Sequence, residues 1–169
     1  MSDRTLGDEA RRLLRERFVG RDAEIGLFDG LVTGAGSKIM WVFGPGGIGK
    51  SALLRCFADR ARGLGCALLP VDLRVIDPSQ ETLAAALQPP PEVTQRLVVL
   101  IDTLERVPRS EEWIRSAVLP LYPEGTVVVV ASRLPPPVAW RLDELSGPLT
   151  HAVALRGLSL GEGSELLVR

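Results

Sequence analysis

A glycine-rich segment with one lysine and one serine is the part of the chain best suited to chemistry. Residues 44–51 read G-P-G-G-I-G-K-S, which fits the pattern G-x-x-x-x-G-K-[ST] and directly follows the apolar run 39–43. Glycines let the main chain approach a triphosphate closely, and a helix that follows them directs its positive N-terminal end at the same group. The segment therefore predicts a phosphate-binding loop, or P-loop, and a nucleotide as the ligand.

Lys50 and Ser51 carry the most specific expectations within this loop. The lysine ammonium is placed to meet the β- and γ-phosphates, and the serine hydroxyl to ligate Mg²⁺. Lys38 is the only other lysine, so a lysine at the motif position is hard to ascribe to basic composition. The loop residues expected to contact the nucleotide are Gly44, Pro45, Gly46, Gly47, Ile48, Gly49, Lys50, Ser51 and Ala52.

An acidic residue at the end of a later apolar run completes the expected metal site. Asp102 follows the run 97–101, and P-loop folds use an aspartate at this position for Mg²⁺, a hard cation that prefers oxygen ligands. Ser51 and Asp102 are thus the predicted metal-binding residues. Two roles are open for Glu105: it orients or deprotonates the attacking water, or it is an ordinary loop residue beside Arg106.

A basic residue follows the valine-rich run 126–131. Arg133 is expected at the same sheet edge as the phosphates, where a guanidinium senses or stabilises γ-phosphate charge. The alternative is a surface arginine in an ion pair. Arg141 is a further candidate of the same kind, and the candidate catalytic set is Lys50, Asp102, Glu105 and Arg133.

Short apolar runs alternate with helical patterns from residue 38 onward, which is typical of an α/β fold with a parallel sheet buried on both faces. The predicted strands are 39–43, 67–73, 97–101, 126–131 and 151–155. The predicted helices are 8–18, 22–32, 50–62, 80–87, 111–119, 138–145 and one that begins near Ser159. Since the carboxyl ends of parallel strands share one edge, this arrangement would gather the candidate residues.

Composition restricts the partners. The 169 residues carry a formal net charge of −1, so there is no global attraction to nucleic acid, and direct nucleic-acid binding by this segment is not expected. No apolar run approaches the ~20 residues that a bilayer requires, and the charged N-terminus does not read as a signal peptide. We expect a cytoplasmic protein without membrane contact.

Five segments in a fixed order together resemble the nucleotide-binding domain of STAND NTPases, the bacterial signal-transduction ATPases related to LuxR-type large regulators and NOD-like receptors. Besides the P-loop they are R-F-V-G-R-D-A-E at 17–24, V-V-L-I-D-T-L-E at 98–105, V-V-V-V-A-S-R at 127–133 and L-R-G-L-S-L-G-E-G-S-E-L-L at 155–167. The resemblance covers nearly the whole chain.

The resemblance implies a three-layer α/β P-loop NTPase fold of the AAA+/STAND type, with a five-stranded parallel sheet in the order 5-1-4-3-2. It also implies a multidomain switch that rests with ADP, exchanges it for ATP and then self-associates. By position, Val19, Gly20 and Arg21 would contact adenine, Lys50 and Ser51 the phosphates and Mg²⁺, and Arg133 would act as the nucleotide sensor. Residues 1–36 would form a helical lead-in and 37–169 the core, a fragment that stops before the lid and winged-helix domains.

One departure from the family pattern bears on catalysis. Many members have a second acidic residue directly after the aspartate that corresponds to Asp102. This chain has Thr103 at that position, which leaves Glu105 as a substitute base. Two functions are therefore open: a switch domain that hydrolyses ATP slowly, and a nucleotide-binding scaffold without hydrolysis. A kinase or GTPase is disfavoured because the chain has no N-K-x-D guanine-reading element.

Overall fold

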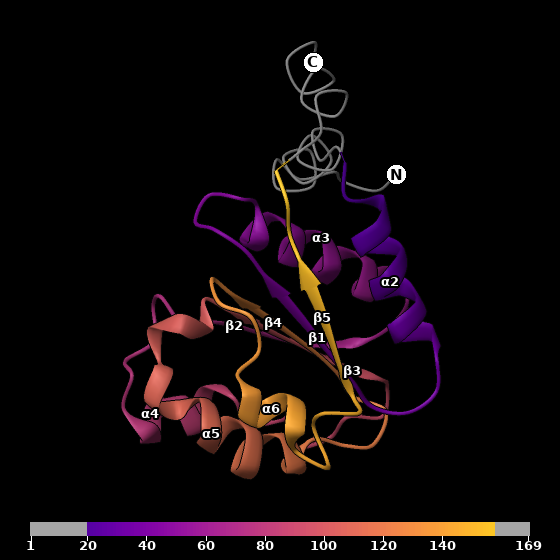
Figure 1. Cartoon of the computed structure of the whole chain (residues 1–169). Coiled ribbons are helices and arrows are strands. Elements are labelled where there is room, and N and C mark those ends of the chain that lie inside the picture. The colour runs from indigo at the N-terminus through magenta and orange to yellow at the C-terminus, as the bar shows by residue number, and fades with distance from the viewer. Residues whose placement is uncertain (1–19, 158–169) are drawn as a thin grey trace.

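The computed structural model describes residues 20–157 as a five-stranded parallel sheet between two layers of helices (Figure 1). The order β2-β3-β4-β1-β5 confirms the order that the resemblance implies, read from the opposite edge. The strands are β1 (Lys38–Phe43), β2 (Ala67–Asp72), β3 (Leu97–Asp102), β4 (Val127–Ser132) and β5 (Thr150–Ala154). The helices predicted at 8–18 and from Ser159 lie outside the described residues.

The helices divide between the two faces of the sheet. Figure 1 shows α2 (Asp22–Thr33) and α3 (Lys50–Gly63) on one face, and α4 (Gln80–Ala86), α5 (Glu111–Trp113) and α6 (Val138–Leu142) on the other. Every residue of β3 and β4 is buried, as expected of central parallel strands covered on both sides.

Alternation along the strands builds one hydrophobic core on each face. In β1, Met40 and Val42 enter the core under α2 and α3, whereas Trp41 enters the core under α4 and α6. Aromatic pairs anchor both layers. Phe28 of α2 stacks on Phe57 of α3 with ring centroids 4.3 Å apart, and Trp41 meets Trp140 of α6 edge to face at 4.9 Å.

The segment 111–119, predicted as one helix, is not a continuous α-helix. Only Glu111–Trp113 is α-helical; a π-helical turn follows at Ile114–Val118 and a 3₁₀ turn at Leu119–Leu121. Pro120 explains the change, because proline has no N–H to donate and its ring collides with the carbonyl four residues earlier in an α-helix. Further 3₁₀ turns lie at Leu104–Arg106 and Pro108–Ser110.

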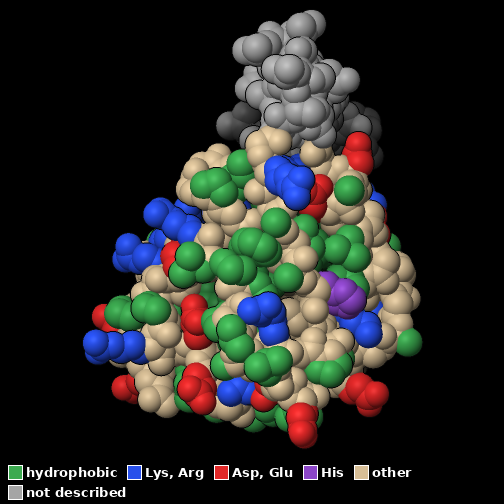
Figure 2. Space-filling view, viewed as in Figure 1, with side chains coloured by type: hydrophobic (Ala, Val, Ile, Leu, Met, Phe, Trp, Pro, Cys, Tyr) green, Lys and Arg blue, Asp and Glu red, His purple; other side chains and the backbone are tan. Residues whose placement is uncertain are grey.

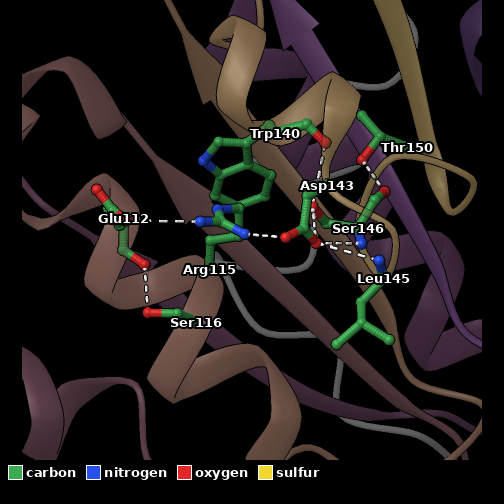
Figure 3. A network of polar contacts seen from close by, with 8 residues as sticks. All are labelled: Glu112, Arg115, Ser116, Trp140, Asp143, Leu145, Ser146 and Thr150. Carbon is green, nitrogen blue, oxygen red and sulfur yellow. Dashed lines mark hydrogen bonds and ion pairs between the residues drawn. The ribbon is translucent and has the colours of Figure 1, made fainter.

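The helix predicted at 138–145 ends early, at Leu142, because Asp143 takes over the local hydrogen bonding (Figure 3). Its carboxylate accepts the N–H groups of Leu145 and Ser146 and the Ser146 hydroxyl, which turns the chain. Arg115 pairs with the same carboxylate from the π-helical turn. The network fixes the connection that leads from α6 into β5.

The surface around these elements is mixed. In the space-filling view, hydrophobic side chains gather near the middle of the visible face, and basic and acidic side chains lie scattered around them (Figure 2). Between residues 20 and 157, no helix combines the length and the apolar character needed to cross a bilayer.

Candidate phosphate-binding site

The carboxyl ends of three neighbouring strands bring the predicted site residues together. The P-loop follows β1, Asp102 ends β3, and Arg133 follows β4, which lies between them. The register pairs Phe43 with Ser132, so the P-loop and Arg133 leave the sheet at the same level. Residues that lie far apart in the chain thus share one edge.

The loop joins α3 through a left-handed glycine. Gly49 is the N-cap of α3 with φ 98°, a conformation that costs a residue with a side chain about 1–2 kcal/mol. Among residues 20–157 no side chain caps the helix, and its first turn has no acidic residue. The N–H groups of this turn, together with the helix dipole, are therefore suited to hold an anion.

Lys50 is buried inside the loop. Its Nζ donates to the carbonyl oxygens of Gly44 at 2.7 Å and Pro45 at 2.9 Å, which curls the loop around the ammonium group. Burial lowers the pKa of Lys50, an effect that the carboxylates of Glu105 and Asp102 oppose and the Arg133 guanidinium reinforces. The other three candidate catalytic residues, Asp102, Glu105 and Arg133, thus lie within electrostatic reach of Lys50.

The base of the loop packs against the chain that leaves β5. The Leu155 N–H donates to Phe43 O at 2.7 Å, and a Cβ atom on Gly44 would lie only 2.9 Å from the Leu155 carbonyl oxygen. Gly44 is therefore required for close approach to the end of β5, in addition to any role with a ligand.

Arg21 ties these two segments together. Its side chain is buried, and its guanidinium donates to Ile48 O at 3.2 Å, Arg156 O at 2.9 Å and the Glu24 carboxylate at 3.3 Å. Of the residues predicted to contact adenine, Arg21 contacts the P-loop, Gly20 precedes Arg21 in the chain, and Val19 lies outside the described residues. The adenine contact itself stays a prediction.

Asp102 is 8% exposed at the end of β3. Its Oδ1 accepts the Thr103 hydroxyl at 3.2 Å, and its Oδ2 faces the Arg74 guanidinium at 3.5 Å. Ser51 and Asp102 line one pocket of about 280 Å³. Hydroxyl and carboxylate oxygens around a shared space suit Mg²⁺, so the residues present fit the predicted cation.

Glu105 returns to the site because Thr103 adopts a left-handed conformation, with φ 64° and ψ 47°. Its carboxylate lies 3.2 Å from the Arg133 Nε and accepts the Arg133 main-chain N–H at 3.2 Å. The Arg133 guanidinium also lies over the P-loop, 3.6 Å from the point where a Cβ of Gly46 would stand. Glu105 thus lies beside Arg133, and Arg133 is in an ion pair within reach of the P-loop.

Two residues of this edge escaped the sequence analysis. Asp72 ends β2 in register with Asp102, and Arg74 pairs with both carboxylates. The sequence carries a signal for Asp72, since an aspartate also directly follows the apolar run 67–71, but the predicted strand 67–73 places this residue inside the strand and not at its end. Arg141 is exposed on α6.

Comparison with known proteins supports the fold and goes no further. No protein-family model matches the chain, and no curated protein is detectably similar in sequence. Among solved structures, Drosophila ORC bound to DNA matches with a TM-score of 0.62 and 17% identity, covering 93% of this chain and 48% of that one. A Thermotoga maritima RuvB mutant matches with a TM-score of 0.54 and 18% identity, covering 89% and 50%.

The fold is that of AAA+ P-loop ATPases, a three-layer α/β structure with the sheet order found here. The chain spans about half the length of the solved structures it matches. The DNA in the first of these structures is bound by Drosophila ORC.

Proposed function

We propose that the chain binds ATP and ADP with Mg²⁺ and works as the switch domain of a larger signalling ATPase that hydrolyses ATP slowly. The P-loop geometry carries this proposal. A buried lysine in a glycine loop, at a helix N-terminus that no described side chain caps and beside a buried aspartate, suits a polyphosphate.

The roles follow from the placement of each group. Lys50 and the N–H groups of α3 would bind the phosphates, and Ser51 and Asp102 would hold the cation. A bound Mg²⁺ supplies charge neutralisation for the phosphates. Glu105 would orient or deprotonate the attacking water, and Arg133 would respond to the γ-phosphate.

The finer assignment rests on the resemblance to STAND NTPases. In this proposal Val19, Gly20 and Arg21 contact adenine, residues 1–36 lead into the core of 37–169, and ATP favours self-association of the full-length protein. Arg21 supports it, since this arginine joins the lead-in to the P-loop and to the chain after β5. A cytoplasmic location and the absence of direct nucleic-acid binding stay predictions.

Calorimetric titration of the 169-residue chain with ADP and with ATP in magnesium buffer tests nucleotide binding. We expect saturable heat with both nucleotides and its loss in Lys50→Ala. Lys38→Ala is the matched control, because it removes the only other lysine from the start of β1, at the opposite end of that strand from the P-loop. No heat from the folded wild type, or equal binding by Lys50→Ala, would refute the proposal.

Hydrolysis is tested separately by phosphate release. A slow rate that falls in Asp102→Ala and in Glu105→Gln supports the switch. The competing function, a nucleotide-binding scaffold, predicts background release in the wild type and in both variants. Robust release that survives Asp102→Ala would contradict the roles assigned here.

A further inference from the structure

One guanidinium is shared by two aspartates at the end of the sheet. Strands β2 and β3 place Asp72 directly beside Asp102. Arg74, two residues after β2, binds Asp72 with both Nε and Nη2, at 2.9 and 2.7 Å, and reaches Asp102 Oδ2 at 3.5 Å. Its main-chain N–H also donates to Asp72 Oδ1 at 3.0 Å, which holds the turn.

This cluster lies where the metal ligands are predicted. Ser51, Asp72, Arg74 and Asp102 line the same pocket of about 280 Å³. Thr103 already engages Oδ1 of Asp102, so the guanidinium approaches the other oxygen of the predicted metal ligand. A positive side chain thus stands at an oxygen that a divalent cation would need.

We propose that Arg74 competes with Mg²⁺ for the Asp102 carboxylate, and that Asp72 limits this competition by holding the guanidinium to itself. The inference rests on the proposed nucleotide function and adds its regulation: the aspartate–arginine pair would set the Mg²⁺ concentration at which the metal–nucleotide complex forms.

The distances support the division of roles. Arg74 makes its short, two-pronged contact with Asp72 and only a long one with Asp102, so the second carboxylate keeps most of its charge for a cation. The Arg74 guanidinium lowers the pKa of the Asp72 carboxyl, which keeps that carboxylate ionised and paired.

Charge arithmetic gives an ordered expectation. Asp72, Arg74 and Asp102 together carry one negative charge. Arg74→Gln leaves two negative charges, Asp72→Asn leaves none and releases the guanidinium to Asp102, and the double variant restores one. Mg²⁺ attraction should therefore rank Arg74→Gln above wild type and double variant, with Asp72→Asn last.

The experiment measures how the affinity for a fluorescent ADP analogue depends on Mg²⁺ concentration, with EDTA as the zero point. Each single variant should shift the Mg²⁺ half-saturation by about three- to tenfold, in opposite directions, and the shifts should shrink as salt is raised. Arg74→Lys keeps the charge and should stay near wild type. Arg55→Gln is the matched control, since it removes another arginine from the rim of the same pocket.

Several results would overturn the inference. One is an equal Mg²⁺ concentration at half-saturation in all variants. Another is a shift of this concentration in the same direction in Arg74→Gln and Asp72→Asn. A third is a shift in Arg55→Gln as large as in Arg74→Gln. If Asp72→Asn fails to fold, Arg74→Gln and Arg74→Lys still decide the question. A wild type without nucleotide binding refutes the proposed function, whereas binding with an unaltered Mg²⁺ dependence refutes only this inference.

Discussion

Glu105 holds Arg133 by two contacts at once, with one carboxylate oxygen 3.2 Å from the Nε and the other accepting the main-chain N–H at 3.2 Å. The residue proposed as the base thus restrains the residue proposed as the γ-phosphate sensor. Because the Arg133 side chain is two-thirds exposed, at 67%, while Glu105 is at 19%, the arginine is the partner free to move.

Glu105→Gln should therefore increase discrimination between ATP and ADP. The amide keeps the size of the side chain but loses the charge that holds Arg133, so the guanidinium becomes available to the nucleotide. We expect the ratio of ADP to ATP dissociation constants to rise by about twofold to fivefold, since one exposed ion pair contributes up to about 1 kcal/mol. Arg133→Gln should bring the ratio close to one.

Arg109→Gln is the control for this pair, because Arg109 is another exposed arginine, in the turn Pro108–Ser110. An unchanged nucleotide ratio in both Glu105→Gln and Arg133→Gln would remove Arg133 as the sensor.

Arg21→Ala should destabilise the fold and weaken nucleotide binding together. The buried guanidinium bonds the Ile48 and Arg156 carbonyl oxygens, and its loss leaves these acceptors unsatisfied at the base of the P-loop. A loss of about 2–3 kcal/mol is expected in urea unfolding at equilibrium. Arg21→Lys should recover little of the lost stability, since an ammonium group cannot span the same acceptors. Full stability in Arg21→Ala would contradict the structural role given to this side chain.

Thr103→Asn should stabilise the protein. Thr103 is the one residue other than glycine with positive φ among residues 20–157, and asparagine tolerates that conformation better than a β-branched residue. We expect a gain of about 0.5–1 kcal/mol in the free energy of unfolding. A clear loss of stability would show that the hydroxyl contact with Asp102 outweighs the backbone strain.

The lowered pKa of Lys50 predicts that the free energy of unfolding depends on pH. Its pKa in the folded protein is lowered from 10.5 by burial, so between the folded and unfolded pKa values the unfolded chain binds more protons. Stability should therefore rise with pH through this window, below pH 10.5. Unfolding of the wild type and Lys50→Met, compared at pH 7.5 and pH 9.5, measures it; the wild type should gain relative to the variant.

Local pattern was sufficient for much of this structure. The short apolar runs predicted the strands of the sheet, and the glycine spacing at 44–49 predicted the P-loop. The aspartate after the run 97–101 predicted a metal-binding residue. Each of these predictions depends only on neighbours within a few positions. The sheet order came from the resemblance, and the structure confirms it. The roles of the site residues stay predictions.

The partners of charged groups were decided by tertiary structure alone. The sequence determined that Asp102 and Arg133 would approach one edge of a parallel sheet, because strand direction carries them there. The resemblance alone assigns Arg21 to this edge, and the sequence leaves the role of Glu105 open. The sequence did not determine that Arg21 bonds main-chain carbonyls, that Glu105 selects Arg133, or that Asp72 and Arg74 flank Asp102. Those choices depend on a left-handed turn at Thr103 and on distances between distant segments, which arise only when the packed strands fix where each side chain begins.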